Sequence, residues 1–195
     1  IDDYVDYMQH ERGLSNNAIN TSLRAIRAFF GFLYQSKLVR ENQMKGYPLL
    51  KVRKGNIETF SIKQLRALLN APDRRTFTGL RDYTYMLLLI ETGIRLSESA
   101  EIRVEDVKLS EGVLFIRHTK NHFHRYVPIQ AKMQEQLKRY MKLRGTCETE
   151  YLFVTLDEEP MKRAALQKIV SKYGKQAGIN NVRCSPHTLR HTFAK

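Results

Sequence analysis

Two short stretches decide the fold of this chain: Thr92-Gly93-Ile94-Arg95-Leu96-Ser97-Glu98 and Ser185-Pro186-His187-Thr188-Leu189-Arg190-His191-Thr192-Phe193. In the first, Gly93 is suited to a positive φ that ends an apolar helix, so Arg95 begins a new turn just after the break. In the second, Ser185 is a predicted N-cap and Pro186 the first helical residue. His187, Arg190 and His191 then follow at spacings of three and four, which places them on one helix face.

These stretches supply the side chains that a reaction at a phosphate needs. The planar guanidinium of arginine binds two phosphate oxygens at once and stays charged at any working pH. Imidazole titrates near neutrality and is therefore suited to moving a proton. Arg95, Arg190 and His187 together predict a site that stabilises negative charge on a phosphate.

At these residues the chain resembles the tyrosine recombinase family, which includes the phage and transposon integrases. The first motif of the family is approximately T-G-x-R-x-x-E, and the second is H-x-L-R-H-T-F-A; residues 92–98 and 187–194 match them. The resemblance implies a mainly α fold with a small antiparallel β-sheet (α+β), in which a helical core-binding domain precedes a catalytic domain of the DNA breaking-rejoining fold. It also implies strand cleavage and rejoining through a 3′-phosphotyrosyl intermediate.

The resemblance implies a role for each matching residue. Arg95 and Arg190 would hold the non-bridging phosphate oxygens, His187 would assist proton movement, and Lys120 would protonate the leaving 5′ oxygen. Glu98 would orient Arg95 or, alternatively, only cap a helix turn. No metal, cofactor or small-molecule substrate is expected, because the phosphotyrosyl link conserves the bond for rejoining.

Lys120 is assigned from its surroundings. The family keeps a lysine at a β-hairpin followed by R-x-V-P, and Lys120, Arg125, Val127 and Pro128 keep that order. An isolated hairpin lysine is more often only a solvated charge, so the flanking match is what favours a catalytic role.

The apolar pattern predicts the order of elements. Apolar residues at spacings of three and four, with caps at Ser15 and Ser61, predict helices at 15–37, 62–70, 78–92, 96–102, 131–143 and 163–177. From residue 104 the period changes to two and predicts three short strands, near 107–109, 113–116 and 126–129, with a turn at Glu111-Gly112. Residues 151–154 form a further strand-like run.

Composition and resemblance together predict the domains. Residues 1–46 are expected to form a helical core-binding (SAM-like) DNA-binding domain, and residues 60–195 the catalytic domain. Gly46, Pro48 and Gly55 interrupt any helix between them, so residues 47–59 are expected to be a basic linker. We expect both domains to be incomplete at the chain ends.

The charge of the chain indicates a polyanionic partner. Lys and Arg number 33 against 20 Asp and Glu, which gives a net charge of +13 and a pI near 9.8. We expect double-stranded DNA as the partner, contacted by Arg24, Arg27, Lys51, Arg53, Lys54, Lys168 and Lys172. The alternative is that these side chains only solvate helix faces and a loop. No signal peptide or membrane-spanning run is visible, so we expect a cytoplasmic protein.

Metal binding is the weaker interpretation of the histidines and cysteines. Two groups have metal-ligating side chains near one another in sequence: His118, His122 and His124, and Cys184, His187 and His191. Neither contains a CxxC or HExxH pattern, which favours a structural or phosphate-binding role. We expect Cys147 and Cys184 to be reduced.

One part of the family pattern is not matched. After the second motif the family has an L-G-H segment and then the nucleophilic tyrosine in a T-x-x-Y setting, whereas this sequence ends at Lys195. Tyr126, Tyr151 and Tyr173 have the wrong neighbours to replace it. We therefore expect residues 1–195 to bind DNA without cutting it, as a monomer in isolation, and the full-length protein to form a tetramer on two DNA sites.

Two other classes of function remain open. A non-catalytic DNA-binding relative acting as a regulator would have no need for Arg95, Lys120, His187 and Arg190 together, and all four are present. A metal-dependent nuclease or phosphatase would need a carboxylate cluster of suitable spacing, which the sequence lacks.

Overall fold

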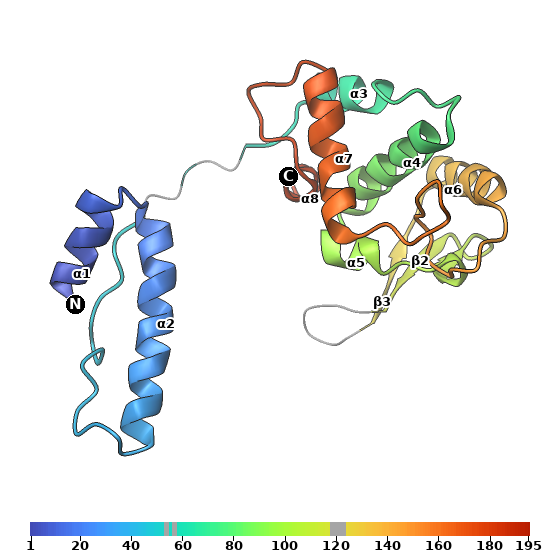
Figure 1. Cartoon of the computed structure of the whole chain (residues 1–195). Helices are drawn as coiled ribbons and strands as arrows, with labels where there is room; N and C mark the ends of the chain where they lie inside the picture. The colour runs from blue at the N-terminus through green and yellow to red at the C-terminus, as the bar shows by residue number, and fades with distance from the viewer. Residues whose placement is uncertain (53–54, 56–57, 118–123) are drawn as a thin grey trace. The chain divides into compact units, whose positions relative to one another are not determined.

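The computed structural model describes residues 1–52, 55, 58–117 and 124–195. It divides into two compact units, Ile1–Asn56 and Ile57–Lys195 (Figure 1). The described residues are mainly helical and include one three-stranded antiparallel sheet, which confirms the predicted fold class.

The first unit is built around one long helix. Helix α1 (Asp2–Asp6) continues into the π-helical turn η1 (Tyr7–Glu11), and α2 (Asn16–Gln35) follows. Ser15 caps α2 as predicted, because its Oγ accepts a hydrogen bond from the Ala18 amide at 3.4 Å. The core of this unit consists of Val5, Ile19, Leu23 and Met44.

Residues 47–51 pack on α2. The Asn20 side chain donates to the Leu50 carbonyl and accepts from the Leu50 amide, both at 2.9 Å, and Asn16 donates to the Lys51 carbonyl at 3.0 Å. Residues 47–51 were assigned from sequence to the linker. These bonds attach them to the first unit.

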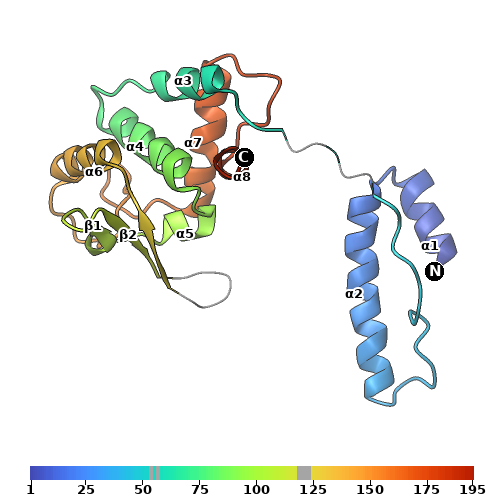
Figure 2. The same ribbon diagram turned by 180° about the vertical axis from the view of Figure 1, so that it is seen from behind.

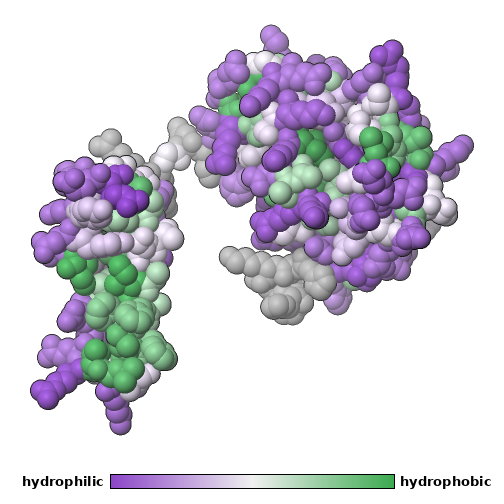
Figure 3. Space-filling model, in the orientation of Figure 1, coloured by the Kyte–Doolittle hydropathy of each residue, from purple (hydrophilic) through white to green (hydrophobic). Residues whose placement is uncertain are grey.

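Exposed apolar side chains gather on the C-terminal half of α2 and just beyond it, where Figure 3 shows a hydrophobic area on this unit. Phe29, Phe32, Tyr34 and Leu38 are 52–67% exposed. The small core of the first unit therefore leaves much of its apolar surface in contact with solvent.

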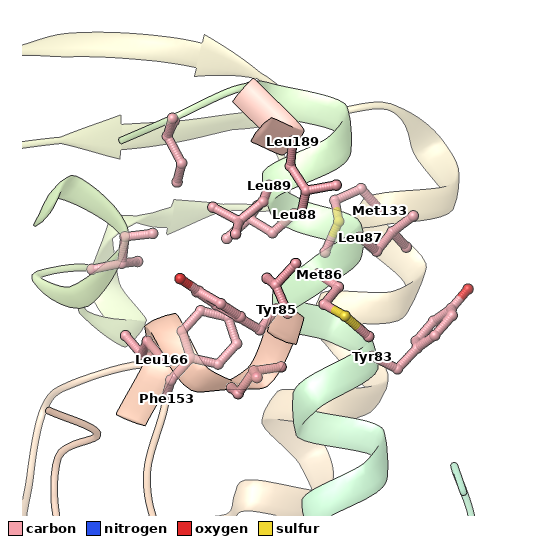
Figure 4. Close-up of a cluster of buried hydrophobic side chains, with 14 of the residues drawn as sticks. Tyr83, Tyr85, Met86, Leu87, Leu88, Leu89, Met133, Phe153, Leu166 and Leu189 are labelled. Carbon is pink, nitrogen blue, oxygen red and sulfur yellow. The ribbon is translucent and has the colours of Figure 1, made fainter. Parts of the chain in front are cut away.

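The second unit is organised around α4 (Phe77–Thr92). Among the described residues its main helix partners are α3 (Ile62–Asn70), α6 (Ala131–Arg144), α7 (Arg163–Gln176) and α8 (Pro186–Phe193). Every residue from Gly79 to Leu89 is buried. Burial of the apolar residues 86–89 is expected for a run without a polar face, whereas Arg81 and Asp82 are buried as an ion pair with their side-chain atoms 2.8 Å apart. Figure 4 shows Met86, Leu88 and Leu89 of α4 in this core with Leu189 of α8.

The sheet has the order β1-β2-β3, with every neighbouring pair antiparallel. Its strands are β1 (Val107–Lys108), β2 (Val113–Ile116) and β3 (Arg125–Pro128). Leu114 pairs with Val107 on one side and Val127 on the other, and it is fully buried. Figure 2 shows β1 and β2 near α5 (Leu96–Ala100) and α6. The alternating pattern of the sequence thus predicted all three strands.

Helix α5 is shorter than predicted. It ends at Ala100 rather than Ile102, and the 3-10 turn η2 (Val104–Asp106) follows. The Ile102 carbonyl accepts from the Leu152 amide at 2.8 Å, and the Val104 amide donates to the Glu150 carbonyl at 2.9 Å. This pairing with the strand-like run near Tyr151 uses backbone groups that a longer helix would need.

In the part of the chain that the structure describes, none of the helices has an apolar stretch long enough to cross a bilayer.

Candidate functional site

The junction between α4 and α5 places Arg95. Gly93 ends α4 with φ 57° and ψ 22°, and its amide donates to the Leu89 carbonyl at 3.0 Å. A Cβ at this position would lie 2.3 Å from Cδ1 of Phe193, so both the left-handed backbone and the close contact favour glycine. Arg95 follows in extended conformation as the N-cap residue of α5.

Helix α8 brings the second motif to the same junction. Ser185 accepts a hydrogen bond from the Thr188 amide at 3.2 Å, and Pro186 occupies the first turn, as predicted. Leu189 is buried against the core, which leaves Arg190 beside the end of α4, where its Nη1 donates to the Gly93 carbonyl. The two motifs are therefore joined by a direct hydrogen bond.

Arg95, His187 and Arg190 line one pocket of about 490 Å³. Arg163 and Gln167 of α7 and Arg183 from the segment before α8 also line it, as do the hydroxyl side chains of Ser97, Ser185 and Thr188. Among the described residues that line this pocket, four are arginines and none is acidic. Such a pocket attracts an anion, and its arginine forks suit the oxygens of a phosphate.

Two other pockets adjoin this one. A pocket of about 560 Å³ shares Gln167, Arg183 and Ser185 with it and adds Lys168 and Lys175 of α7. A larger pocket of about 1190 Å³ shares Arg95 and Arg163, but it is lined largely by apolar groups. The smaller arginine pocket is the candidate site because it alone of the three is lined by residues of both motifs.

Glu98 lies directly beneath Arg95. Its carboxylate accepts hydrogen bonds from Arg95 Nη1 and the Arg95 amide, each at 2.8 Å. Arg125 of β3 donates to the same carboxylate through Nη1 at 3.0 Å and Nη2 at 2.8 Å. Burial by itself would raise the pKa of Glu98, but these bonds outweigh it and lower the pKa to about 2. Glu98 is therefore an ionised anchor for the Arg95 side chain.

His187 contacts a second imidazole. Its Nε2 lies 2.8 Å from Nε2 of His191, and the two rings meet edge to face with centroids 4.2 Å apart. One of these nitrogens donates and the other accepts, so His187, which lines the pocket, is hydrogen-bonded to His191. Within the described ranges no group of three His, Cys, Asp or Glu side chains is placed to hold a metal ion. His118 and His122 lie outside the described residues.

The other proposed basic residues differ in their surroundings. In the first unit, Arg24 and Lys51 are exposed, whereas Arg27 donates to the Tyr47 carbonyl. On α7, Lys168 lines the neighbouring pocket of about 560 Å³ together with Arg183. The Lys172 ammonium lies 3.9 Å from the Asp82 carboxylate and over the Tyr173 ring. Lys120, Arg53 and Lys54 lie outside the described residues.

Three residues of the site were missed from sequence: Arg125, Arg163 and Arg183. Arg125 belongs to the R-x-V-P run that matches the family, but the sequence did not predict its contact with Glu98. Arg163 begins the helix predicted at 163–177, and Arg183 precedes the Ser185 cap by two residues. Arg163 and Arg183 can be recognised as pocket residues only from the structure, in which α7 packs beside α5 and α8.

Comparison with known proteins gives one family match and several related recombinases. Residues 58–195 match the phage integrase family. The tyrosine recombinase XerC of Bacillus subtilis is 32% identical over 192 residues, which are 95% of this chain and 62% of the relative. XerC of Thermodesulfovibrio yellowstonii is 30% identical over 192 residues, with 94% of this chain and 63% of the relative covered. The chain thus spans less than two thirds of the length of these relatives.

Solved structures share the fold. The integrase of transposon Tn1549 in complex with transposon right end DNA matches with a TM-score of 0.78 at 21% identity, covering 95% of this chain and 67% of that one. The XerA recombinase matches with a TM-score of 0.63 at 24% identity, covering 99% of this chain and 65% of that one.

Proposed function

We propose a function for this chain from its family, because the chain belongs to the phage integrase family of tyrosine recombinases. The protein that contains residues 1–195 carries out site-specific DNA recombination, cleaving and rejoining strands through a 3′-phosphotyrosyl intermediate. The observation that supports this most directly is that Arg95, His187 and Arg190, which are distant in sequence, line one pocket free of acidic groups among its described residues.

The two arginines bind the scissile phosphate. Arg95 is held by Glu98 through Nη1, and Arg190 by the Gly93 carbonyl through Nη1, so each guanidinium is fixed at one nitrogen. In this proposal the remaining N–H groups bind the non-bridging oxygens, where charge increases in the transition state. Donors fixed before the reaction stabilise that charge without reorganising.

Proton transfer is assigned to His187 and Lys120. His187 is hydrogen-bonded to His191 and assists proton movement at the nucleophile or the phosphate. Lys120, assigned through its match to the family, protonates the leaving 5′ oxygen. We expect no metal ion or cofactor to take part.

The nucleophilic tyrosine is proposed to come from outside residues 1–195. No tyrosine is among the described residues that line the arginine pocket. Tyr85, Tyr140 and Tyr173 are buried, burial raises the pKa of each, and each hydroxyl is bonded to a neighbouring group: Ser99, the Leu152 carbonyl and Asp82. Residues 1–195 alone therefore bind DNA without cutting it.

The partner is double-stranded DNA. Residues 1–46 are proposed to act as the core-binding domain and residues 60–195 as the catalytic domain, with Arg24, Lys51 and Lys168 at the phosphate backbone. The full-length protein is proposed to form a tetramer on two DNA sites. We place this activity in the cytoplasm, with the DNA on which it acts.

Covalent trapping tests the proposal. The protein expressed from its natural reading frame is incubated with a nicked duplex that contains the end of its element. We expect a covalent complex through a 3′ phosphate, and Arg95→Ala should slow its formation by roughly 10²- to 10³-fold while DNA affinity changes little. Arg75→Ala, which removes a guanidinium whose side chain is 90% exposed, is the control and should leave the rate unchanged.

The contrary outcomes are specific. DNA binding with no covalent complex at any time would indicate the non-catalytic regulator instead. Undiminished complex formation by Arg95→Ala would remove Arg95 from the reaction.

A further inference from the structure

The Glu98 carboxylate lies between two guanidinium groups that come from different elements. Arg95 begins α5, and Arg125 begins β3. Four donors reach the two carboxylate oxygens: Arg95 Nη1 and the Arg95 amide at 2.8 Å, and Arg125 Nη1 and Nη2 at 3.0 and 2.8 Å. The fork of Arg125 is bidentate, whereas Arg95 gives only one side-chain nitrogen. Glu98 thus accepts two side-chain hydrogen bonds from Arg125 and one from Arg95.

The carboxylate of Glu98 is buried, so its charge acts strongly on neighbouring groups. Its side chain is 1% exposed, whereas the Arg95 and Arg125 side chains are 43% and 36% exposed. Water does not reach the carboxylate and therefore screens its charge poorly. Any negative charge on Glu98 that is not balanced by the protein acts on whatever lies at Arg95.

The charges of Glu98, Arg95 and Arg125 add up to a net charge of +1. If Glu98 were paired with Arg95 alone, the pair would be neutral, and a phosphate at Arg95 would gain little from the guanidinium. Arg125 contributes a second positive charge, so the group of three carries a net charge of +1. Within the described residues, Arg95 Nε and Nη2 form no hydrogen bond, so these two nitrogens remain available to a phosphate.

We propose that Arg125 is a positioning residue that balances the charge of Glu98, so that Glu98 can hold Arg95 without neutralising it for the phosphate. This inference rests on the proposed function, because it needs a phosphate at Arg95. Arg125 itself does not touch the phosphate in this proposal; its effect passes through the buried carboxylate.

The test compares two ways of changing the same charge. In Arg125→Gln, the charge of Glu98 is balanced by Arg95 alone, and cleavage of the nicked duplex by the protein from its natural reading frame should slow by roughly 10- to 100-fold. In the double variant Glu98→Gln/Arg125→Gln, both charges are gone, Arg95 again has an excess charge, and most of the rate should return. Arg125→Lys restores the charge without the fork and should also recover most of the rate. Rates are measured in a single turnover at saturating DNA, on protein shown to be folded.

A matched control separates charge from structure. Arg117 also pairs with a buried carboxylate near the same sheet, with Nη2 2.7 Å from Asp106 Oδ1, but it does not line the arginine pocket. Arg117→Gln should leave the cleavage rate per folded molecule unchanged. If Arg125 only holds β3 in place, the double variant and Arg125→Lys will be as slow as Arg125→Gln, and the proposal is wrong.

Failure of the inference is distinguishable from failure of the proposed function. Loss of cleavage in Arg95→Ala with full activity in Arg125→Gln would overturn only the role of Arg125. A second readout needs no nucleophile: binding of tungstate, a tetrahedral oxyanion, to residues 1–195 followed by NMR at the arginine side chains. Arg125→Gln should weaken this binding roughly 10-fold, and the double variant should restore it; equal affinity in all three proteins would contradict the proposal.

Discussion

At the scale of single residues, Glu98 determines how Arg95 is held and links the site to the pH dependence of stability. Its pKa is lowered to about 2 from an ordinary value of 4.5, against the effect of burial, by hydrogen bonds from Arg125 and Arg95. A carboxyl group with a lower pKa in the folded chain stabilises the fold above its unfolded pKa. The stabilisation by Glu98 is therefore complete above pH 4.5 and is lost as the pH falls toward 2.

We expect Glu98→Gln to lower the free energy of unfolding by about 3 kcal/mol at neutral pH. The difference from the natural sequence should shrink progressively below pH 4.5, because protonation then removes the same charge from Glu98. Urea unfolding of both proteins from neutral pH to about pH 3 measures this difference. Glu101→Gln, at an exposed position at the end of the same helix, is the control and should show no such trend. A constant difference at every pH would mean that the Glu98 charge is not the cause.

The residues of the site were predictable to different degrees. Arg95, His187 and Arg190 were predictable because each lies in a motif whose local structure the sequence specifies, through Gly93 and the Ser185-Pro186 cap. The Arg125 contact was not predictable in this way, because it depends on the distance between β3 and α5. That distance is set by packing of the core rather than by any local pattern.

At the scale of elements, caps and apolar periodicity predicted most helices within a few residues. Ser15, Ser61 and Ser185 each cap the helix expected of them. The error at the end of α5 has a tertiary cause: the Ile102 carbonyl bonds to the Leu152 amide, fifty residues later in the chain. Local sequence favours helix there, and pairing with a distant segment overrides it.

The cap of α8 is a testable link between sequence and site. Ser185→Ala removes the Oγ that accepts from the Thr188 amide, so we expect the free energy of unfolding to fall by about 1 kcal/mol. Ser171→Ala is the matched control, because Ser171 Oγ only donates to the Lys168 carbonyl within α7, and it should cost less than about 0.5 kcal/mol. Urea unfolding measures both. Equal losses would show that the hydroxyl does not act as a helix cap.

At the scale of the whole molecule, the two units differ in how their sequences use apolar residues. The second unit surrounds α4 with helices on several sides, and the apolar run at residues 86–90 predicted burial of the C-terminal part of that helix, but not of Arg81 and Asp82. The first unit has four residues in its core and exposes Phe29 and Phe32 on α2 and Leu38 just beyond it. The apolar stripe of α2 predicted a helix correctly, but periodicity alone does not tell which part of the stripe is covered.

The net charge of +13 should make DNA binding by residues 1–195 strongly dependent on salt. Each phosphate that a lysine neutralises contributes about 0.9 to the slope of log affinity against log salt concentration. Lys168 lines a pocket beside Arg183, so Lys168→Gln should reduce the slope by nearly that amount. Lys172, one turn later, lies 3.9 Å from Asp82 and 4.7 Å from the Tyr173 ring centre, so its charge is already partly balanced and Lys172→Gln should reduce the slope less. Fluorescence anisotropy with a labelled duplex at several salt concentrations measures both slopes, and equal reductions would contradict this difference between the two lysines.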